Sequence, residues 1–235
     1  QLLSGERSTV GAEFYNHAAL PVGLAVLALM GIGQLSATEA STAGLGRRLL
    51  VPALFGFGVT AAVGFLTRPS ALAAVAFGVA AFVLVGVLVG RRLSPGLLAH
   101  TGVAVLCIGI AASSSYSVAG TAELDVGQSA RIAGTTTRLV GTDRVAEPDR
   151  ITVTAQLEVS DAGHTEKLTP RLHYYPGRDM TVGAPAVRSA FTGDTYATLT
   201  AVDGAGRHVS IRLARNSFVW LIWLGGAILA AAGCW

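Results

Sequence analysis

The chain has 235 residues, of which 51% are hydrophobic and only 13% are charged, whereas about a quarter of the residues of an ordinary soluble protein are charged. Of the 31 charged residues, 22 lie between Glu123 and Arg215, so the sequence indicates a membrane protein that carries one soluble insert. Acidic and basic residues cancel within the insert. The formal net charge of +3 therefore comes from the loops of the membrane part and gives no reason to expect nucleic-acid binding.

Five uncharged apolar stretches are long enough to cross a bilayer core of about 30 Å. We expect a polytopic α-helical protein with spans at about residues 18–38, 49–67, 69–90, 94–116 and 216–235. Residues 1–116 would then form a membrane bundle and 216–235 a final transmembrane helix. The spans are rich in Gly and Ala, which lets helix backbones approach each other closely.

The arginines between the spans predict the orientation of the chain. Arg47 and Arg48 fall on the same side as Arg91 and Arg92, and only Arg68 lies in the opposite short turn. The excess of positive charge in cytoplasmic loops predicts that both arginine pairs are cytoplasmic and that the insert at 117–215 is extracytoplasmic. The chain begins without an initiator Met or a visible signal peptide, which suggests a fragment or a split-gene product of a longer protein.

The insert has the alternating pattern of half-buried strands. Apolar and polar side chains alternate in residues 151–160, and the same period recurs in 208–214 and around 196–202. Turn residues separate these runs at 161–163 and 203–206. We therefore expect one antiparallel β domain of about six to eight strands, arranged as a small sandwich or barrel.

Four of the five histidines have an ordinary structural explanation. His164 lies in a hairpin turn, and His173 and His208 lie where partial burial is normal. His17 is at the outer mouth of the first span, where a polar ring is tolerated at the membrane interface. The two cysteines lie in apolar runs and are expected to be core residues, with no disulfide or zinc spacing.

His100 is the exception, because it lies inside the fourth span among apolar and small residues. An ionisable residue within a span is by default a hypothesis of function. A neutral imidazole there is either a histidine that hydrogen-bonds a neighbouring helix or an axial ligand of haem iron. Gly96 and Gly102 flank it and could admit a flat macrocycle.

Four segments, in order along the chain, carry a resemblance to a known family. They are Ser8–Gly11 with Phe14–Asn16 and Pro21, Leu98–Ala104 with Ile108–Ile110, Asp194–Tyr196, and Trp220–Gly226. They are spread along nearly the whole length of the chain, which resembles the carboxyl-terminal part of the CcmF family, the membrane haem lyases of cytochrome c maturation system I.

The resemblance implies that a periplasmic haem chaperone supplies haem, which is then attached to the CXXCH motif of an apocytochrome c. It also implies a haem b in the bacterial inner membrane with His100 as an axial ligand of its iron, other maturation subunits as partners, and a β domain on the periplasmic side. The family's tryptophan-rich external loop, its external haem-binding histidines and its first transmembrane ligand lie upstream, in another part of the same protein or in a companion chain. Catalysis is therefore not assigned to this chain alone.

Two departures from the family and two alternative functions stay open. The basic pair that often precedes two aromatic residues in the family's outer domain is Leu172–His173 here, and His17 matches no part of the pattern. The alternative from another class is a noncatalytic membrane scaffold whose β domain docks assembly partners, with His100 as a structural polar residue. A transporter or receptor is disfavoured, because only the fourth span carries an ionisable residue.

Overall fold

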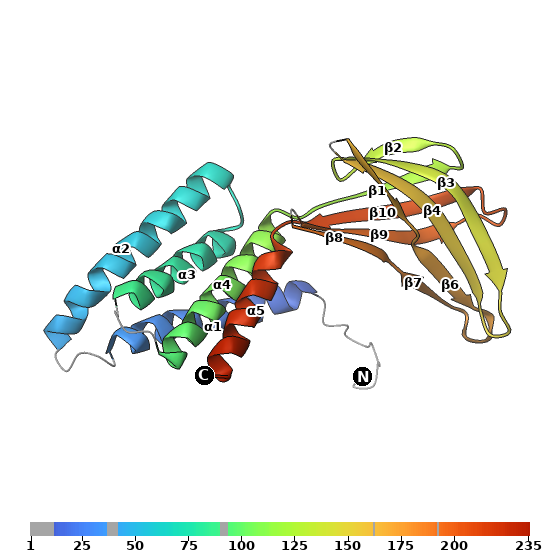
Figure 1. Cartoon of the computed structure of the whole chain (residues 1–235). Helices are drawn as coiled ribbons and strands as arrows, with labels where there is room; N and C mark the ends of the chain where they lie inside the picture. Colours follow the sequence, from blue (N-terminus) through green and yellow to red (C-terminus); the bar gives the residue numbers. More distant parts are fainter. Residues whose placement is uncertain (1–11, 37–41, 90–93, 162, 192) are drawn as a thin grey trace, which may run out of the picture. The chain divides into compact units, whose positions relative to one another are not determined.

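The computed structural model describes residues 12–36, 42–89, 94–161, 163–191 and 193–235, and the side chains of 12–19 and 42–43 lie outside this description. The chain divides into two compact units. One is a helical bundle formed by residues 1–115 and 220–235, and the other is a β domain formed by 116–219. Each unit is described by itself (Figure 1).

Five apolar helices lie at the five predicted places. They are α1 (Ala12–Ser36), α2 (Thr42–Thr67), α3 (Ala71–Val89), α4 (Pro95–Ser115) and α5 (Val219–Gly233). Among the described residues three helices, α2 to α4, are long and apolar enough to cross a membrane. The stretches Leu20–Ser36 and Val219–Gly233 are apolar but shorter, so a crossing by α1 and α5 stays a prediction.

Local capping sets where two of the helices begin. The hydroxyl oxygen of Ser70 accepts a hydrogen bond from the Ala73 amide, and that of Ser94 accepts one from Leu97. Such side chains satisfy amides in the first turn that have no partner within the helix. Pro95 follows Ser94 at the first helical position, where its missing N–H is harmless. Between α2 and α3, Arg68 has a positive φ of 48° and precedes Pro69, so the chain turns there.

Small residues bring the helices of the bundle into backbone contact. A methyl carbon placed on Gly225 of α5 would lie 2.6 Å from the Leu106 amide nitrogen of α4, and one placed on Gly56 of α2 would lie 2.7 Å from the Gly78 carbonyl oxygen of α3. Any larger residue would push these helices apart. The expectation that glycine allows close approach is met at both contacts.

The β domain contains ten strands within the residues that the structure describes, rather than six to eight. They are β1 (Val118–Asp125), β2 (Ser129–Ile132), β3 (Thr135–Ala146), β4 (Ile151–Asp161), β5 (His164–Leu168), β6 (Arg171–Tyr175), β7 (Met180–Ala184), β8 (Ala186–Ala190), β9 (Gly193–Val202) and β10 (His208–Asn216). Several strands have only five residues or fewer, too short for a clear alternating pattern, which is why the sequence predicts too few.

The strands form two antiparallel sheets with one core between them. One sheet has the order β1-β10-β9-β8, and the other has the order β2-β3-β4-β6-β7 with β5 paired to β4. The first and last strands of the domain are neighbours, with Val118 opposite Arg215. The predicted alternation is realised in β4 and β10, whose apolar side chains fill the core at Val153, Ala155, Leu157, Val159, Val209, Ile211 and Leu213. The domain is therefore a sandwich rather than a barrel.

Candidate functional site

The half-buried imidazole of His100 makes a hydrogen bond between two helices of the bundle. His100 lies five residues after the first residue of α4, and its Nδ1 is 2.8 Å from Oε1 of Gln34, near the carboxyl end of α1. The two residues are 66 positions apart in the chain. The contact therefore depends on the fold and is not local to one helix.

The NH2 group of the Gln34 amide determines which ring nitrogen of His100 carries the proton. Nε2 of Gln34 donates to the carbonyl oxygen of Val83 in α3, at 2.9 Å. A backbone carbonyl can only accept, so the amide must present its oxygen to His100. The group that donates to this oxygen is then Nδ1–H of His100. In a neutral imidazole the other nitrogen, Nε2, consequently holds the lone pair.

Gly86 makes the space that this amide occupies. It is buried on α3, and a methyl carbon at this position would lie 2.4 Å from Nε2 of Gln34 and 3.5 Å from a methyl group of Leu35. The amide of Gln34 would have to move away from an alanine here. Three helices thus contribute to the site: α1 provides the amide, α3 the carbonyl and the space, and α4 the histidine.

The space around His100 differs from the one expected from the sequence. Gly102 does not face an open region, because a methyl carbon there would lie 2.8 Å from Cγ of Leu229 in α5. The expectation that Gly102 admits a macrocycle is wrong, since this glycine is used for the contact between α4 and α5. Gly96 is exposed, and a methyl carbon there would meet nothing within 4 Å.

The bundle also contains an apolar cavity of about 700 Å³ between α1, α3 and α4. Leu27, Val103 and Cys107 line it within the bundle, and Arg68 and Ser115 line it at the end where α2 turns into α3. His100 is absent from its lining, so this cavity is separate from the His100–Gln34 pair. Among the described residues that line it there is no histidine.

The other histidines with described side chains all lie in the β domain. In the β domain, His173 Nδ1 is 2.9 Å from the Thr152 hydroxyl, and His164 is exposed at the start of β5. His208 faces Asp125 at 3.0 Å and Glu123 at 3.5 Å, and the hydrogen bond to Asp125 raises the pKa of this histidine above 6.5. His17 belongs to α1, but its side chain is outside the described residues. Within the described part of the chain there is no group of three or more potential metal ligands.

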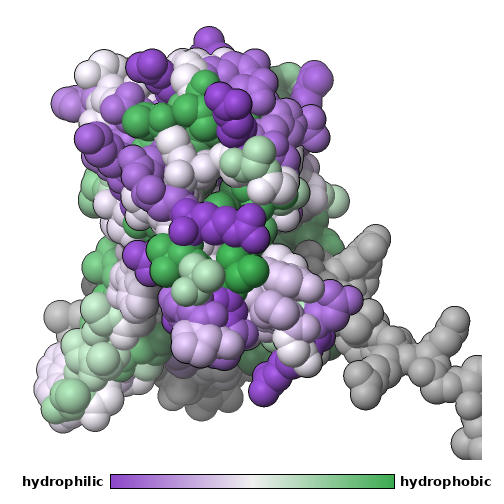
Figure 2. All heavy atoms as spheres, turned by 90° about the vertical axis from the view of Figure 1, so that its right-hand side faces the viewer, coloured by the Kyte–Doolittle hydropathy of each residue, from purple (hydrophilic) through white to green (hydrophobic). Residues whose placement is uncertain are grey.

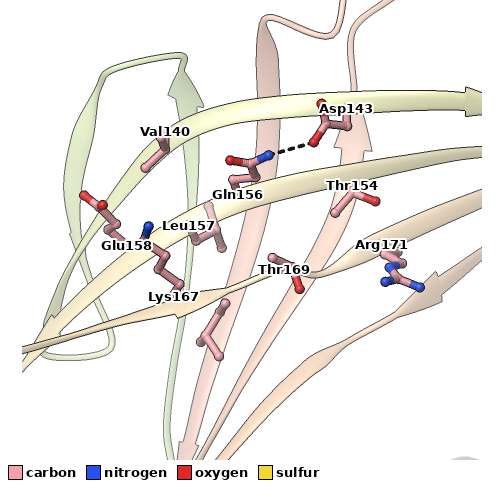
Figure 3. Close-up of a pocket in the computed structure, with 10 residues that line it drawn as sticks. Val140, Asp143, Thr154, Gln156, Leu157, Glu158, Lys167, Thr169 and Arg171 are labelled. Atoms are coloured by element: carbon pink, nitrogen blue, oxygen red, sulfur yellow. Dashed lines mark hydrogen bonds between the residues drawn. The ribbon is translucent and has the colours of Figure 1, made fainter.

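The β domain has a shallow groove on the sheet that contains β3, β4 and β5 (Figure 3). It encloses about 220 Å³, and Gln156 donates a hydrogen bond of 2.7 Å to Asp143 at its rim. Glu158, Lys167 and Arg171 also line it, so both signs of charge are present.

Figure 2 looks onto the end of the β domain where the β3–β4, β6–β7 and β9–β10 turns lie in Figure 1. Hydrophilic side chains dominate this face and surround separate small hydrophobic areas. A second hollow of about 480 Å³ is lined there by Arg144, Tyr174 and the turn at 203–206. Charge and polarity of this kind are typical of a surface exposed to water.

Gln34 is the residue of the site that the sequence interpretation missed. An amide within an otherwise apolar helix is itself an indication, because buried Asn and Gln side chains in membrane proteins hydrogen-bond across helices. Nothing in the sequence pairs it with His100, however, since the two lie on different spans. Only the arrangement of α1, α3 and α4 brings them together.

Comparison with known proteins gives one consistent result. Residues 115–217 match the family model described as the CcmF C-terminal beta-sandwich. The cytochrome c-type biogenesis protein CycK of Bradyrhizobium diazoefficiens is 26% identical over 99% of this chain and 39% of its own length. The cytochrome c-type biogenesis protein CcmF of Pseudomonas aeruginosa is 27% identical over 98% of this chain and 38% of its own length.

A solved structure described as cytochrome c heme lyase CcmF has the same fold. It aligns with a TM-score of 0.70 and 23% sequence identity, over 95% of this chain and 40% of the solved chain. The chain thus spans about two fifths of the length of the relatives that it matches from end to end. Its β domain matches the CcmF C-terminal β-sandwich, and the chain as a whole is similar to the carboxyl-terminal part of CcmF proteins.

Proposed function

We propose that this chain is the carboxyl-terminal part of a membrane haem lyase, which assists the covalent attachment of haem to the CXXCH motif of apocytochrome c. The relatives that match it along its length are named as cytochrome c-type biogenesis proteins, which supports this assignment. The single observation that carries the proposal is His100, a histidine within an apolar helix whose Nδ1 is occupied by Gln34. Its Nε2 is left with the lone pair that a metal ligand needs.

In this proposal His100 is an axial ligand of haem b. The donor set fits the group, because a neutral imidazole coordinates iron through one nitrogen while the other nitrogen donates a hydrogen bond. When bound, haem b would supply a one-electron redox centre within the membrane. The second axial ligand is proposed to come from an upstream part of the same protein or from a companion chain.

The proposed setting is the bacterial inner membrane, with all five helices crossing it. Arg47 and Arg48 lie near the amino end of α2, and Arg91 and Arg92 follow α3 in the sequence, which favours a cytoplasmic location for the α1–α2 and α3–α4 connections. The β domain is then periplasmic. There it can dock the haem chaperone, the apocytochrome or other maturation subunits, and the mixed charge of the groove at Asp143, Glu158 and Lys167 supports such a docking role.

The test is the haem spectrum of the intact protein, purified with all its parts. Replacing His100 with Ala should abolish the reduced α-band of a bis-histidine haem b and stop cytochrome c maturation. Expression should be largely unchanged. His173→Ala and His208→Ala are matched controls, since both histidines have partners within the β domain, and His17→Ala is a third control. A normal α-band and normal maturation in His100→Ala would refute the assignment.

The second candidate, a noncatalytic scaffold, is favoured by the same hydrogen bond. A histidine that only ties α4 to α1 would also face Gln34 at 2.8 Å. In that case His100→Ala would lower the stability of the protein, and any haem present would keep its ligands and spectrum. The spectrum therefore separates the two functions, whereas loss of stability alone does not.

A further inference from the structure

Gln34 forms a continuous hydrogen-bonded chain from α3 through α1 to the histidine of α4. The chain runs from the Val83 carbonyl to the Gln34 amide and on to Nδ1 of His100. We propose that Gln34 is a positioning residue that holds His100 as the Nδ1–H tautomer, with Nε2 available to iron. This inference rests on the proposed function, because it concerns how the ligand is prepared and not whether His100 is a ligand.

The first argument is the direction of the two hydrogen bonds. The Val83 oxygen can accept from the amide only if Nε2 of Gln34 faces it, and Oε1 must then face His100. A histidine protonated only on Nε2 would bring two acceptors, its Nδ1 lone pair and the amide oxygen, together at 2.8 Å. The fold therefore selects one tautomer, and it is the tautomer whose Nε2 can bind a metal.

The second argument is the environment of the amide. The surroundings of the pair are apolar on one side, because Val83 and Ala104 belong to a buried hydrophobic cluster with Leu27 and Ala80. The neighbouring hydroxyl of Thr101 donates to the Leu97 carbonyl within its own helix. An amide and a ring N–H that lost each other in apolar surroundings would each leave a polar group unsatisfied.

The third argument is the space made by Gly86. The absence of a side chain at this buried position lets Nε2 of Gln34 reach the α3 backbone. Alanine would place a carbon 2.4 Å from that nitrogen, and the atom displaced is the far end of a flexible side chain. Substitution at Gly86 should therefore shift the amide while leaving the helices in place, which provides a second way to perturb the pair.

A carbonyl oxygen that accepts from the free N–H of a ligating imidazole raises the basicity of the ligating nitrogen. It therefore stabilises ferric over ferrous iron, and loss of such a partner typically weakens metal ligation by roughly 10–100-fold. Loss of the Gln34 oxygen should accordingly raise the midpoint potential of the haem. A tenfold change in the preference for ferric iron corresponds to about 59 mV for one electron.

The experiment uses the intact protein and measures the reduced α-band, the haem content and the midpoint potential. Gln34→Leu should bind haem at least tenfold more weakly and raise the potential. Gly86→Ala should change both in the same direction, to a smaller extent. Gln34→Glu should retain haem, because a neutral carboxylic acid can donate to Val83 and accept from His100, and its potential should not exceed that of the unsubstituted protein.

Gly33→Ala is the matched control for these variants. Gly33 adjoins Gln34 on α1, is exposed, and has nothing within 4 Å of the position of an added methyl carbon. It should leave all three measurements unchanged. If His100→Ala loses the haem spectrum but Gln34→Leu and Gly86→Ala keep the normal potential and haem content, the positioning role is overturned and the proposed function stands. If His100→Ala keeps the spectrum, the proposed function itself fails.

Discussion

The core of the β domain allows a prediction whose size follows from the structure. Leu157 is 1% exposed and lies between Leu139 of β3 and Leu168 of β5 in the register of the sheet. Leu157→Ala removes three buried carbons, worth about 2.4 kcal/mol at about 0.8 kcal/mol each. The cavity left behind adds to this, so the free energy of unfolding should fall by about 3–4 kcal/mol, within the usual range of about 2.7–5 kcal/mol for buried leucines.

The assay is urea unfolding of the isolated residues 116–219, followed by far-ultraviolet circular dichroism. This unit has its own buried core and should fold without the helices. Val145→Ala on β3 is the matched control, because Val145 is 55% exposed and its loss should cost about 1 kcal/mol or less. Equal losses for the two variants would contradict the core position of Leu157. A helical or unfolded fragment would mean that the domain depends on the bundle.

Two further predictions concern orientation and pH. An Asp149→Cys variant, with both native cysteines replaced by alanine, should react with a membrane-impermeant thiol reagent on intact cells, because Asp149 is exposed in the β3–β4 turn. Reaction only after lysis would reverse the proposed topology. The pKa of His208 is raised above 6.5, chiefly by its hydrogen bond to Asp125 and further by Glu123. The stability that this contact contributes is therefore fully present below pH 6.5, and it is lost as the pH rises through the pKa of His208 in the folded state. His208→Gln should therefore destabilise the isolated β domain at pH 5.5 and have little effect at pH 8.5, and an equal effect at both values would refute the role of the ion pair.

The elements that the sequence predicts well are those with a strong one-dimensional pattern. The apolar runs of α2, α3 and α4 are long and strongly hydrophobic, so composition alone locates them. The long strands β4 and β10 alternate because one face of each is buried against the opposite sheet. Strands such as β5 and β7 have five residues each and contribute few core side chains, which leaves little periodicity to detect.

The site could be predicted only in part, for a similar reason. His100 is conspicuous because a titratable group in an apolar helix is costly, and its position needs no knowledge of neighbours. Gln34 has a function only through contacts with residues far away in the sequence, and Gly86 only through an atom of Gln34. Gly102 lies two residues from His100, but whether it faces a ligand or another helix depends on where α5 packs.

The pairing of β1 with β10 brings the two ends of the β domain together. Because Val118 lies opposite Arg215, the chain enters and leaves the β domain at adjacent points, about 5 Å apart as for any two neighbouring strands. Within the bundle, a methyl carbon on Gly109 of α4 would lie 2.8 Å from the Ile222 amide of α5, so these helices are also neighbours near the ends that flank the domain. The β domain is therefore an insertion between two neighbouring helices, α4 and α5. Another sandwich whose ends are equally close together would fit at this place without any rearrangement of the helices.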